Sequence, residues 1–215
     1  PVGRKRVARL MTSAGIEARP RRRFKTTTDS EHGEAIAPNL LGRVFDAERP
    51  NQVWVTDVKA VWTTDGWLSV APVIDLCSRR VVGLGIRENN DTDLTLAALD
   101  DAVARRNPAP GLIHHSDRGA PYASHRYRRR LARIRSLAGM SRKGDCWDNA
   151  VAESFFSTLV HELLGRLPTR SMAETERVIR EYIDTFYNPR RRRSTLGYLS
   201  PLEYELRLQS AAIAA

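Results

Sequence analysis

Three carboxylate residues lie within or next to apolar segments, where a charged side chain is unexpected. Asp57 lies within Val53–Val61, a run that is otherwise rich in the β-branched and aromatic residues typical of a strand. Asp117 directly follows a short apolar strand, Leu112–His115, and Glu153 lies close to the apolar stripe of a predicted helix. Carboxylate oxygens are the ligands that Mg²⁺ prefers, and two such ions roughly 3.5–4 Å apart activate an attacking hydroxyl and stabilise a leaving oxygen. Metal-assisted phosphodiester chemistry therefore requires carboxylates from different elements to converge at one point.

Each carboxylate also has a purely structural interpretation. Asp57 is equally compatible with a satisfied charge on an edge strand. Asp117 alone is typical of a turn residue or a helix cap, and Glu153 alone is typical of an exposed helix surface. Three candidates in one ordered pattern favour a joint site, but their spacing alone does not decide between the two interpretations.

The chain is strongly basic. Its 35 Lys and Arg residues against 25 Asp and Glu give a formal net charge of +10 and a pI near 10.3. This balance favours a polyanionic partner, most often nucleic acid, over the alternative of a merely solvated basic surface. Basic side chains cluster in residues 1–25, 126–135 and 190–193, and such clusters bind phosphates and release counterions. The candidate DNA contacts are Arg118, Asn149, Arg142, Lys143, Arg190, Arg191, Arg192, Arg193, Arg4, Lys5 and Arg6.

The hydrophobic pattern predicts the elements that must position these residues. The predicted strands are Val53–Val61, Trp67–Leu76 after a hairpin turn at Asp65-Gly66, Arg80–Arg87 and Leu112–His115. The predicted helices cover 94–102, 126–135, a segment beyond Gly144 with Asp145 as N-cap, 171–187, and a closing helix with Ser200, Pro201 and Glu203 as N-cap, N1 and N3. This order predicts an α/β fold, a mixed sheet with helices packed on it.

Composition divides the chain into three parts. Residues 1–45 read as a basic helical segment stopped by Gly15 and a linker, which we expect to be the remnant of an upstream DNA-binding region because the first residue is Pro1. Residues 46–207 form the main domain, and 208–215 a tail. No apolar run approaches the ~20 residues of a membrane helix, and the two cysteines lack the spacing of a disulfide framework or a zinc ribbon. We therefore expect a cytoplasmic protein without a membrane partner or an organic cofactor.

Longer motifs surround the three carboxylates in the same order. They are Asn51–Asp57 (NQVWVTD), His114–Gly119 (HHSDRG) and Asp148–Phe156 (DNAVAESFF), and 35 residues separate Asp117 from Glu153. Ser141–Gly144, Tyr187-Asn188 and Leu196–Pro201 add to the pattern. Over about 45–207 the chain resembles bacterial insertion-sequence transposases, specifically the second-reading-frame (OrfB-type) protein, and the interval between Asp117 and Glu153 is shared with retroviral integrases.

The resemblance implies a ribonuclease-H-like fold and a DDE site in which Asp57, Asp117 and Glu153 bind two Mg²⁺ or Mn²⁺ ions. It implies DNA cleavage and strand transfer without a covalent enzyme intermediate. Water first frees a DNA 3′-hydroxyl, and that hydroxyl then attacks a second phosphodiester. The implied partners are the DNA of the element ends and of the target, and a homo-oligomer is implied to bind them. The protein is then associated with the nucleoid, and an upstream helix-turn-helix region recognises the ends.

Three positions depart from the family pattern. Val160, with His161 beside it, stands where the family carries Lys or Arg seven residues after the glutamate. Pro121 replaces a glutamine, and Lys59 replaces a threonine or tyrosine near Asp57. Two alternative functions therefore accompany the transposase hypothesis: a catalytically weak or inactive DNA-binding remnant of a transposase, and a ribonuclease-H-type nuclease.

Overall fold

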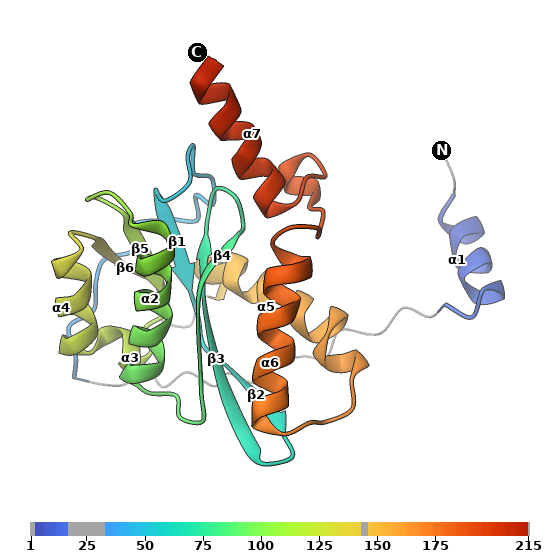
Figure 1. Ribbon diagram of the computed structural model, residues 1–215, viewed down its shortest axis with the longest axis horizontal. Helices are drawn as coiled ribbons and strands as arrows, with labels where there is room; N and C mark the ends of the chain where they lie inside the picture. Colours follow the sequence, from blue (N-terminus) through green and yellow to red (C-terminus); the bar gives the residue numbers. More distant parts are fainter. Residues whose placement is uncertain (1–2, 17–32, 143–145, 215) are drawn as a thin grey trace.

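The computed structural model describes residues 3–16, 33–142 and 146–214 (Figure 1). Its strands are β1 (Val53–Thr56), β2 (Lys59–Thr63), β3 (Gly66–Asp75), β4 (Val81–Arg87), β5 (Ile113–Ser116) and β6 (Leu137–Met140). Its α-helices are α1 (Arg4–Ser13), α2 (Thr92–Arg106), α3 (Ala120–Ala123), α4 (His125–Arg133), α5 (Ala150–Glu162), α6 (Met172–Tyr182) and α7 (Pro201–Ala214). Short 3₁₀ turns cover Cys146–Asn149, Leu164–Arg166 and Ser194–Leu196, and a π-helical turn, Ile183–Tyr187, extends α6. No helix in these ranges is both long and apolar enough to span a bilayer.

The strands form one mixed sheet. Across it, β4 pairs with β3, β3 with β1, β1 with β5 and β5 with β6. The β1–β5 and β5–β6 pairs are parallel and the pairs of β3 are antiparallel. A mixed sheet flanked by helices confirms the predicted α/β fold class.

The predicted strand Val53–Val61 is interrupted at Asp57. β1 and β2 pair with the same side of β3 in one continuous register, from Trp54↔Asp75 to Thr63↔Gly66. That register places Asp57 opposite Pro72, which has no amide hydrogen to give to the ladder. The Pro72 carbonyl instead accepts from the Thr56 hydroxyl at 2.8 Å. The backbone hydrogen-bond ladder between the two strands is therefore interrupted at Asp57, while the register on either side of it is unchanged.

Helices cover both faces of the sheet (Figure 1). One apolar core lies between the sheet and helices α5 and α6, and includes Val55, Phe155 and Ile179. The other lies against α2, α3 and α4 and includes Trp54. On this second face α2 packs so tightly that a Cβ on Gly83 would lie 2.4 Å from the Ala98 carbonyl oxygen, so the contact requires glycine.

Side chains and loops occupy the outer edges of the sheet. The Asn188 amide pairs with edge strand β4 as a further strand would, because its Oδ1 accepts from Val81 N and its Nδ2 donates to Val81 O, both at 3.0 Å. At the opposite edge, Met140 N of β6 donates to Pro38 O at 3.1 Å. Pro38 belongs to the predicted linker, so residues after about 38 pack against the core.

Two further elements are absent from the sequence-based expectation, and the start of a third differs from it. Strand β6 and helix α3 were not predicted, because both are only four residues long and carry no clear hydrophobic period. Helix α5 begins at Ala150 with Asn149 as N-cap, and the proposed cap Asp145 lies outside the described residues. The β2–β3 hairpin and the closing helix are confirmed.

The closing helix carries the predicted capping box. Ser200 N donates to the Glu203 carboxylate at 2.8 Å, and Glu203 N donates to Ser200 Oγ at 3.3 Å. Helix α7 continues from there to Ala214, so residues 208–214 of the predicted tail are helical.

Candidate active site

Asp57 and Asp117 lie at the same end of two neighbouring strands of the sheet. Val55 of β1 is paired with His115 of β5, and the two strands are parallel. Each aspartate comes two residues after its member of that pair, so both lie beyond the carboxyl ends of adjacent strands. Local hydrogen bonds orient them: Val58 N donates to Asp57 Oδ1 at 2.9 Å, and Gly119 N donates to Asp117 Oδ1 at 3.0 Å. Both side chains are half-buried.

Glu153 approaches from helix α5. It lies in the first turn of that helix and is exposed, while Phe155 and Phe156 fix the opposite side of the helix in the core. The start of α5 is tied to the end of β1, because Asn149 Nδ2 donates to the Thr56 carbonyl at 3.0 Å. The helix therefore begins beside the residue that precedes Asp57.

The three carboxylates influence one another electrostatically. Burial raises the pKa of Asp57 to about 8, and the negative charges of Asp117 and Glu153 add to this rise, while the hydrogen bond from Val58 opposes it. Lys59 lies beside the group with its ammonium 5.8 Å from the centre of the Phe156 ring. Burial lowers the pKa of Lys59, whereas Asp57 and Glu153 raise it.

The donor set suits a hard divalent cation. Its members are carboxylates, and Asp57 is destabilised as an anion by its like-charged neighbours, a cost that a cation would remove. Within the described part of the chain, Asn149 Oδ1 is also a buried acceptor without a hydrogen-bond donor. Among residues 3–16, 33–142 and 146–214, however, no group of three His, Cys, Asp or Glu is already gathered at ligand spacing. The carboxylates are thus coupled neighbours and not a preformed cage.

Two of the predicted DNA-contacting arginines have protein partners beside the site. Arg118 Nε donates to the Ser141 carbonyl at 2.7 Å. Arg142 forms a bidentate pair with Asp148, with both guanidinium nitrogens at 2.9 Å from the carboxylate oxygens. Asn149, the predicted polar contact, is buried. Lys143 lies outside the described residues.

The arginine block 190–193 divides into two pairs. Arg191 binds the carboxylate of Glu162, the last residue of α5, at a distance of 2.7 Å. Arg193 packs over the Tyr187 ring and donates to its hydroxyl. Both are half-buried, whereas Arg190 and Arg192 are exposed. The exposed pair is therefore the part of the block that is open to a phosphate.

The remaining residues singled out in the sequence lie on helices α1 and α5 and on strand β2. Arg4, Lys5 and Arg6 are exposed on α1. Val160 is half-buried on α5, two turns beyond Glu153, and His161 is exposed. Lys59 was recognised in the sequence only as a departure from the family, although strand alternation places it on the same face as Asp57.

Asp75 does not belong to the site. It lies at the end of β3, which is antiparallel to β1, so it is at the edge of the sheet opposite Asp57. Its carboxylate accepts from Asn51 N at 2.6 Å and from Cys77 N at 3.0 Å. The bond from Cys77 closes the turn after β3, and the bond from Asn51 ties this turn to the residues before β1.

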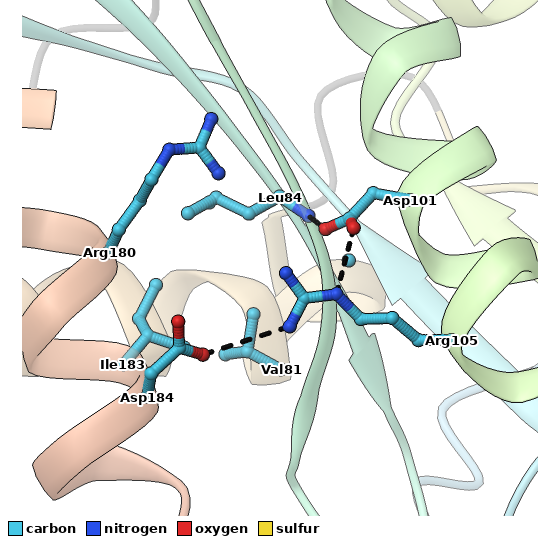
Figure 2. Close-up of a pocket in the computed structure, with 8 residues that line it drawn as sticks. Val81, Leu84, Asp101, Arg105, Arg180, Ile183 and Asp184 are labelled. Carbon is cyan, nitrogen blue, oxygen red and sulfur yellow. Dashed lines mark hydrogen bonds and ion pairs between the residues drawn. The ribbon is translucent and has the colours of Figure 1, made fainter. Parts of the chain in front are cut away.

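A small polar cavity of about 10 Å³ lies between β4, α2 and the π-helical turn (Figure 2). None of the three carboxylates lines it. Asp101 accepts from Leu84 N at 3.0 Å and from Arg105 at 2.8 Å, and Arg105 reaches Asp184 at 3.7 Å. Asp101, Arg105 and Asp184 are thus paired with one another, and they link α2 to the π-helical turn, whereas Arg180 pairs with Glu176 of its own helix.

Comparisons with known proteins identify the family of this chain. Two models of the integrase core domain match residues 47–146 and 137–201. An uncharacterized 31 kDa protein of insertion element IS600 from Shigella sonnei is 42% identical over 203 residues, which are 94% of this chain and 75% of that protein. The transposase of IS904 from Lactococcus lactis is 37% identical over 94% of this chain and 79% of the relative. Transposase InsF of IS3A from Escherichia coli is 37% identical over 95% and 71%.

Solved structures give the same fold at low sequence identity. The catalytic core domain of the HTLV-2 integrase, determined in complex with magnesium, aligns with a TM-score of 0.59 and 14% identity over 74% of this chain and 99% of that one. A chain of the simian T-cell lymphotropic virus intasome aligns with a TM-score of 0.56 and 15% identity over 74% and 55%. The fold is therefore that of the retroviral integrase cores, and by its sequence this chain belongs to the insertion-sequence transposases with an integrase core domain.

Proposed function

We propose that this transposase cuts and joins DNA with Asp57, Asp117 and Glu153 as its catalytic and metal-binding residues. The observation that carries the proposal is the placement of Asp57 and Asp117 beyond adjacent parallel strands, with Glu153 coupled to them electrostatically. The substrate phosphodiesters are those of element ends and target DNA. Water attacks the first and releases a 3′-hydroxyl, and this hydroxyl attacks the second while the target's own 3′-oxygen leaves.

The chain's own residues hold the reactants for these two displacements. Two Mg²⁺ or Mn²⁺ ions, when bound, would activate the attacking oxygen and stabilise the leaving one. Asp57 and Asp117 present their oxygens from the rigid sheet, and Glu153 reaches the same region from α5. Lys59 supplies a positive charge beside the carboxylates.

DNA binding is proposed to use the exposed basic side chains. Arg190 and Arg192 lie near the end of the core, and Arg4, Lys5 and Arg6 lie on α1. Arg118, Arg142 and Lys143 are further proposed contacts, and the first two would have to share their present protein partners with a phosphate. We also propose that a homo-oligomer binds the paired ends, as the multimeric state of the related HTLV-2 integrase core suggests.

The proposal is tested by incubating the purified chain with Mn²⁺ and labelled duplexes. One substrate carries the element end joined to flanking DNA, and the other is an RNA–DNA hybrid of the same sequence. We expect 3′-end cleavage of the first and joining of its product to a target plasmid. Cleavage of the hybrid alone would establish the ribonuclease alternative instead, and duplex binding without turnover would establish an inactive remnant, for which Val160 is the motivating observation.

Metal binding should depend on pH through Asp57. Its pKa is raised to about 8, so near pH 6.5 the carboxyl is protonated and must release its proton before it binds a cation. Affinity for Mg²⁺ should therefore fall by up to about tenfold for each pH unit below 8. The raised pKa also means that the folded metal-free chain holds this proton more tightly than the unfolded chain, so its stability declines as pH rises from about 4 to 8.

Differential scanning fluorimetry checks this prediction. The rise in Tm on adding Mg²⁺ should be larger near pH 8.5 than near pH 6.5, with ionic strength matched by NaCl. In Asp57→Asn the rise should largely disappear at both values. An equal rise at both pH values in the unmodified chain would contradict the assignment of Asp57 as a ligand.

A further inference from the structure

Asp148 is a buried anion held by two separate segments of the chain. Its side chain has no exposed surface. Arg142 donates to it through its backbone N and its guanidinium, all at 2.9 Å. Asn39 Nδ2 donates at 2.8 Å and Arg43 Nε at 3.3 Å. These bonds, those of Arg142 above all, keep the pKa of Asp148 far below its usual range.

Two of these donors come from the predicted linker. Asn39 also closes a tight turn, because its Oδ1 accepts from the backbone N of Leu41 at 3.1 Å and of Gly42 at 3.0 Å. Leu41 is buried in the core beneath α5 and α6. Arg43 adopts a left-handed backbone conformation with φ 68°, which is uncommon for a residue with a Cβ. The segment 38–43 is therefore shaped to direct Asn39 and Arg43 towards Asp148.

The residue after Asp148 is anchored to a different element, strand β1. Asn149 donates to the carbonyl of Thr56, the last residue before Asp57. The start of α5 is thus held between the linker segment and the end of β1. Glu153 lies one turn further along the same helix, so any shift of this start carries its carboxylate with it.

We propose that Asp148 is a positioning residue through which the linker segment 38–43 sets the placement of Glu153. The inference rests on the proposed function in one respect, the role of Glu153 at the metal site. Its consequence is that the segment preceding the core and the catalytic helix move together. A signal that displaces residues 38–43, such as DNA bound by the upstream part of the chain, then reaches Glu153 directly.

The first experiment measures amide hydrogen exchange in the metal-free, DNA-free 215-residue chain. The variants are Asp148→Asn and Arg43→Ala, and the second leaves the Arg142 pair in place, so it should fold even if the first is damaged. Glu34→Gln is the matched control, because Glu34 lies just before segment 38–43 and forms an ion pair with Arg128 of α4 at 3.2 Å. We expect amide exchange in the first turns of α5 to become roughly tenfold faster in both variants, because each loses at least one charge-assisted hydrogen bond. Exchange in the control should be unchanged.

The second experiment separates positioning from simple stability. Mn²⁺ binding is measured by electron paramagnetic resonance, and strand transfer is measured at saturating DNA across a Mn²⁺ titration, all below the Tm of every variant. Losing a residue that orients a metal ligand typically costs about 10–100-fold in metal affinity or activity. We expect such a loss in Asp148→Asn, a smaller one in Arg43→Ala, and none in Glu34→Gln.

The outcomes are distinct. Faster exchange in α5 together with weaker Mn²⁺ binding supports the proposal. Unchanged exchange in α5, or altered exchange with wild-type Mn²⁺ affinity and rate, overturns it. If the unmodified chain neither binds Mn²⁺ nor transfers strands, the proposed function fails and the link to Glu153 fails with it. If the unmodified chain does both and the variants match it, only the present inference is refuted.

Discussion

Asp117→Asn should reduce DNA cleavage and strand transfer by roughly 1000-fold without unfolding the protein. Bound metal ions supply several kcal/mol of transition-state stabilisation, and each ~1.4 kcal/mol is a factor of ten in rate. Asparagine keeps the shape of the side chain and can still accept the bond from Gly119 N. It removes the charge, however, and with it most of the attraction for a divalent cation. The loss should therefore appear as a change in turnover.

The same substitution should leave the metal-free fold as stable as before, or more so. Asp117 contributes to the raised pKa of Asp57, so removing its charge relieves a repulsion between the two carboxylates. Single-turnover cleavage in Mn²⁺ and thermal unfolding, measured side by side, test both statements. Asp100→Asn is the charge-matched control, because Asp100 is on α2 and pairs only with Arg130 among the interactions described. Near-normal cleavage by Asp117→Asn would remove this residue from the site.

Glu205→Gln should cost about 3 kcal/mol in the free energy of unfolding. Glu205 of α7 is buried and binds Arg106 with two bonds of 2.8 and 2.9 Å, Arg80 at 2.6 Å and Ser78 at 2.8 Å. Removing one partner of a buried ion pair leaves the other charge uncompensated, at a cost of about 3–5 kcal/mol. Arg80 is 31% exposed, so solvent compensates part of its charge and the lower end of that range applies.

Urea denaturation and calorimetry measure this effect. For a protein of this size the expected fall in Tm is about 6–12 °C. Glu181→Gln removes an equal charge from an exposed pair with Arg177 and should change stability by less than about 1 kcal/mol. Burial raises the pKa of Glu205, but the bonds from Arg106 and Arg80 outweigh it and lower the pKa overall. The gap between Glu205→Gln and the unmodified chain should therefore close in acid, as Glu205 is protonated. A gap that is independent of pH would contradict the ionic origin of the effect.

The sequence was informative where local pattern and tertiary position coincide. Asp57 and Asp117 were singled out because one lies within an apolar run and the other directly follows an apolar strand, and the family resemblance joined them in one predicted site. That they lie beyond the carboxyl ends of adjacent parallel strands became apparent only from the fold. The interruption of the first strand was not predicted, because it depends on Pro72 in the neighbouring strand. Strand β6 was missed since four residues carry too little periodicity.

The environment of Asp148 was beyond local reasoning. In the sequence it is only the first residue of a motif, whereas its partners Asn39 and Arg43 are 109 and 105 residues away in the chain. No local rule relates such distant polar residues. Arg142 was predicted as a DNA contact from its charge and its place in the motif Ser141–Gly144, and its bidentate pair with Asp148 became apparent only when the fold placed the two side chains together.

The covered edges of the sheet bear on how this protein survives at high local concentration. An exposed edge strand recruits strands of other chains and begins aggregation. Here Asn188 occupies the hydrogen-bonding groups of Val81 on β4, and Asp101 accepts from Leu84 N on the same strand. At the other edge Pro38 accepts from Met140 N of β6. These groups of β4 and β6 are therefore not available to a strand of another copy, so that contacts between copies at these two edges are left to side chains and not to the peptide backbone.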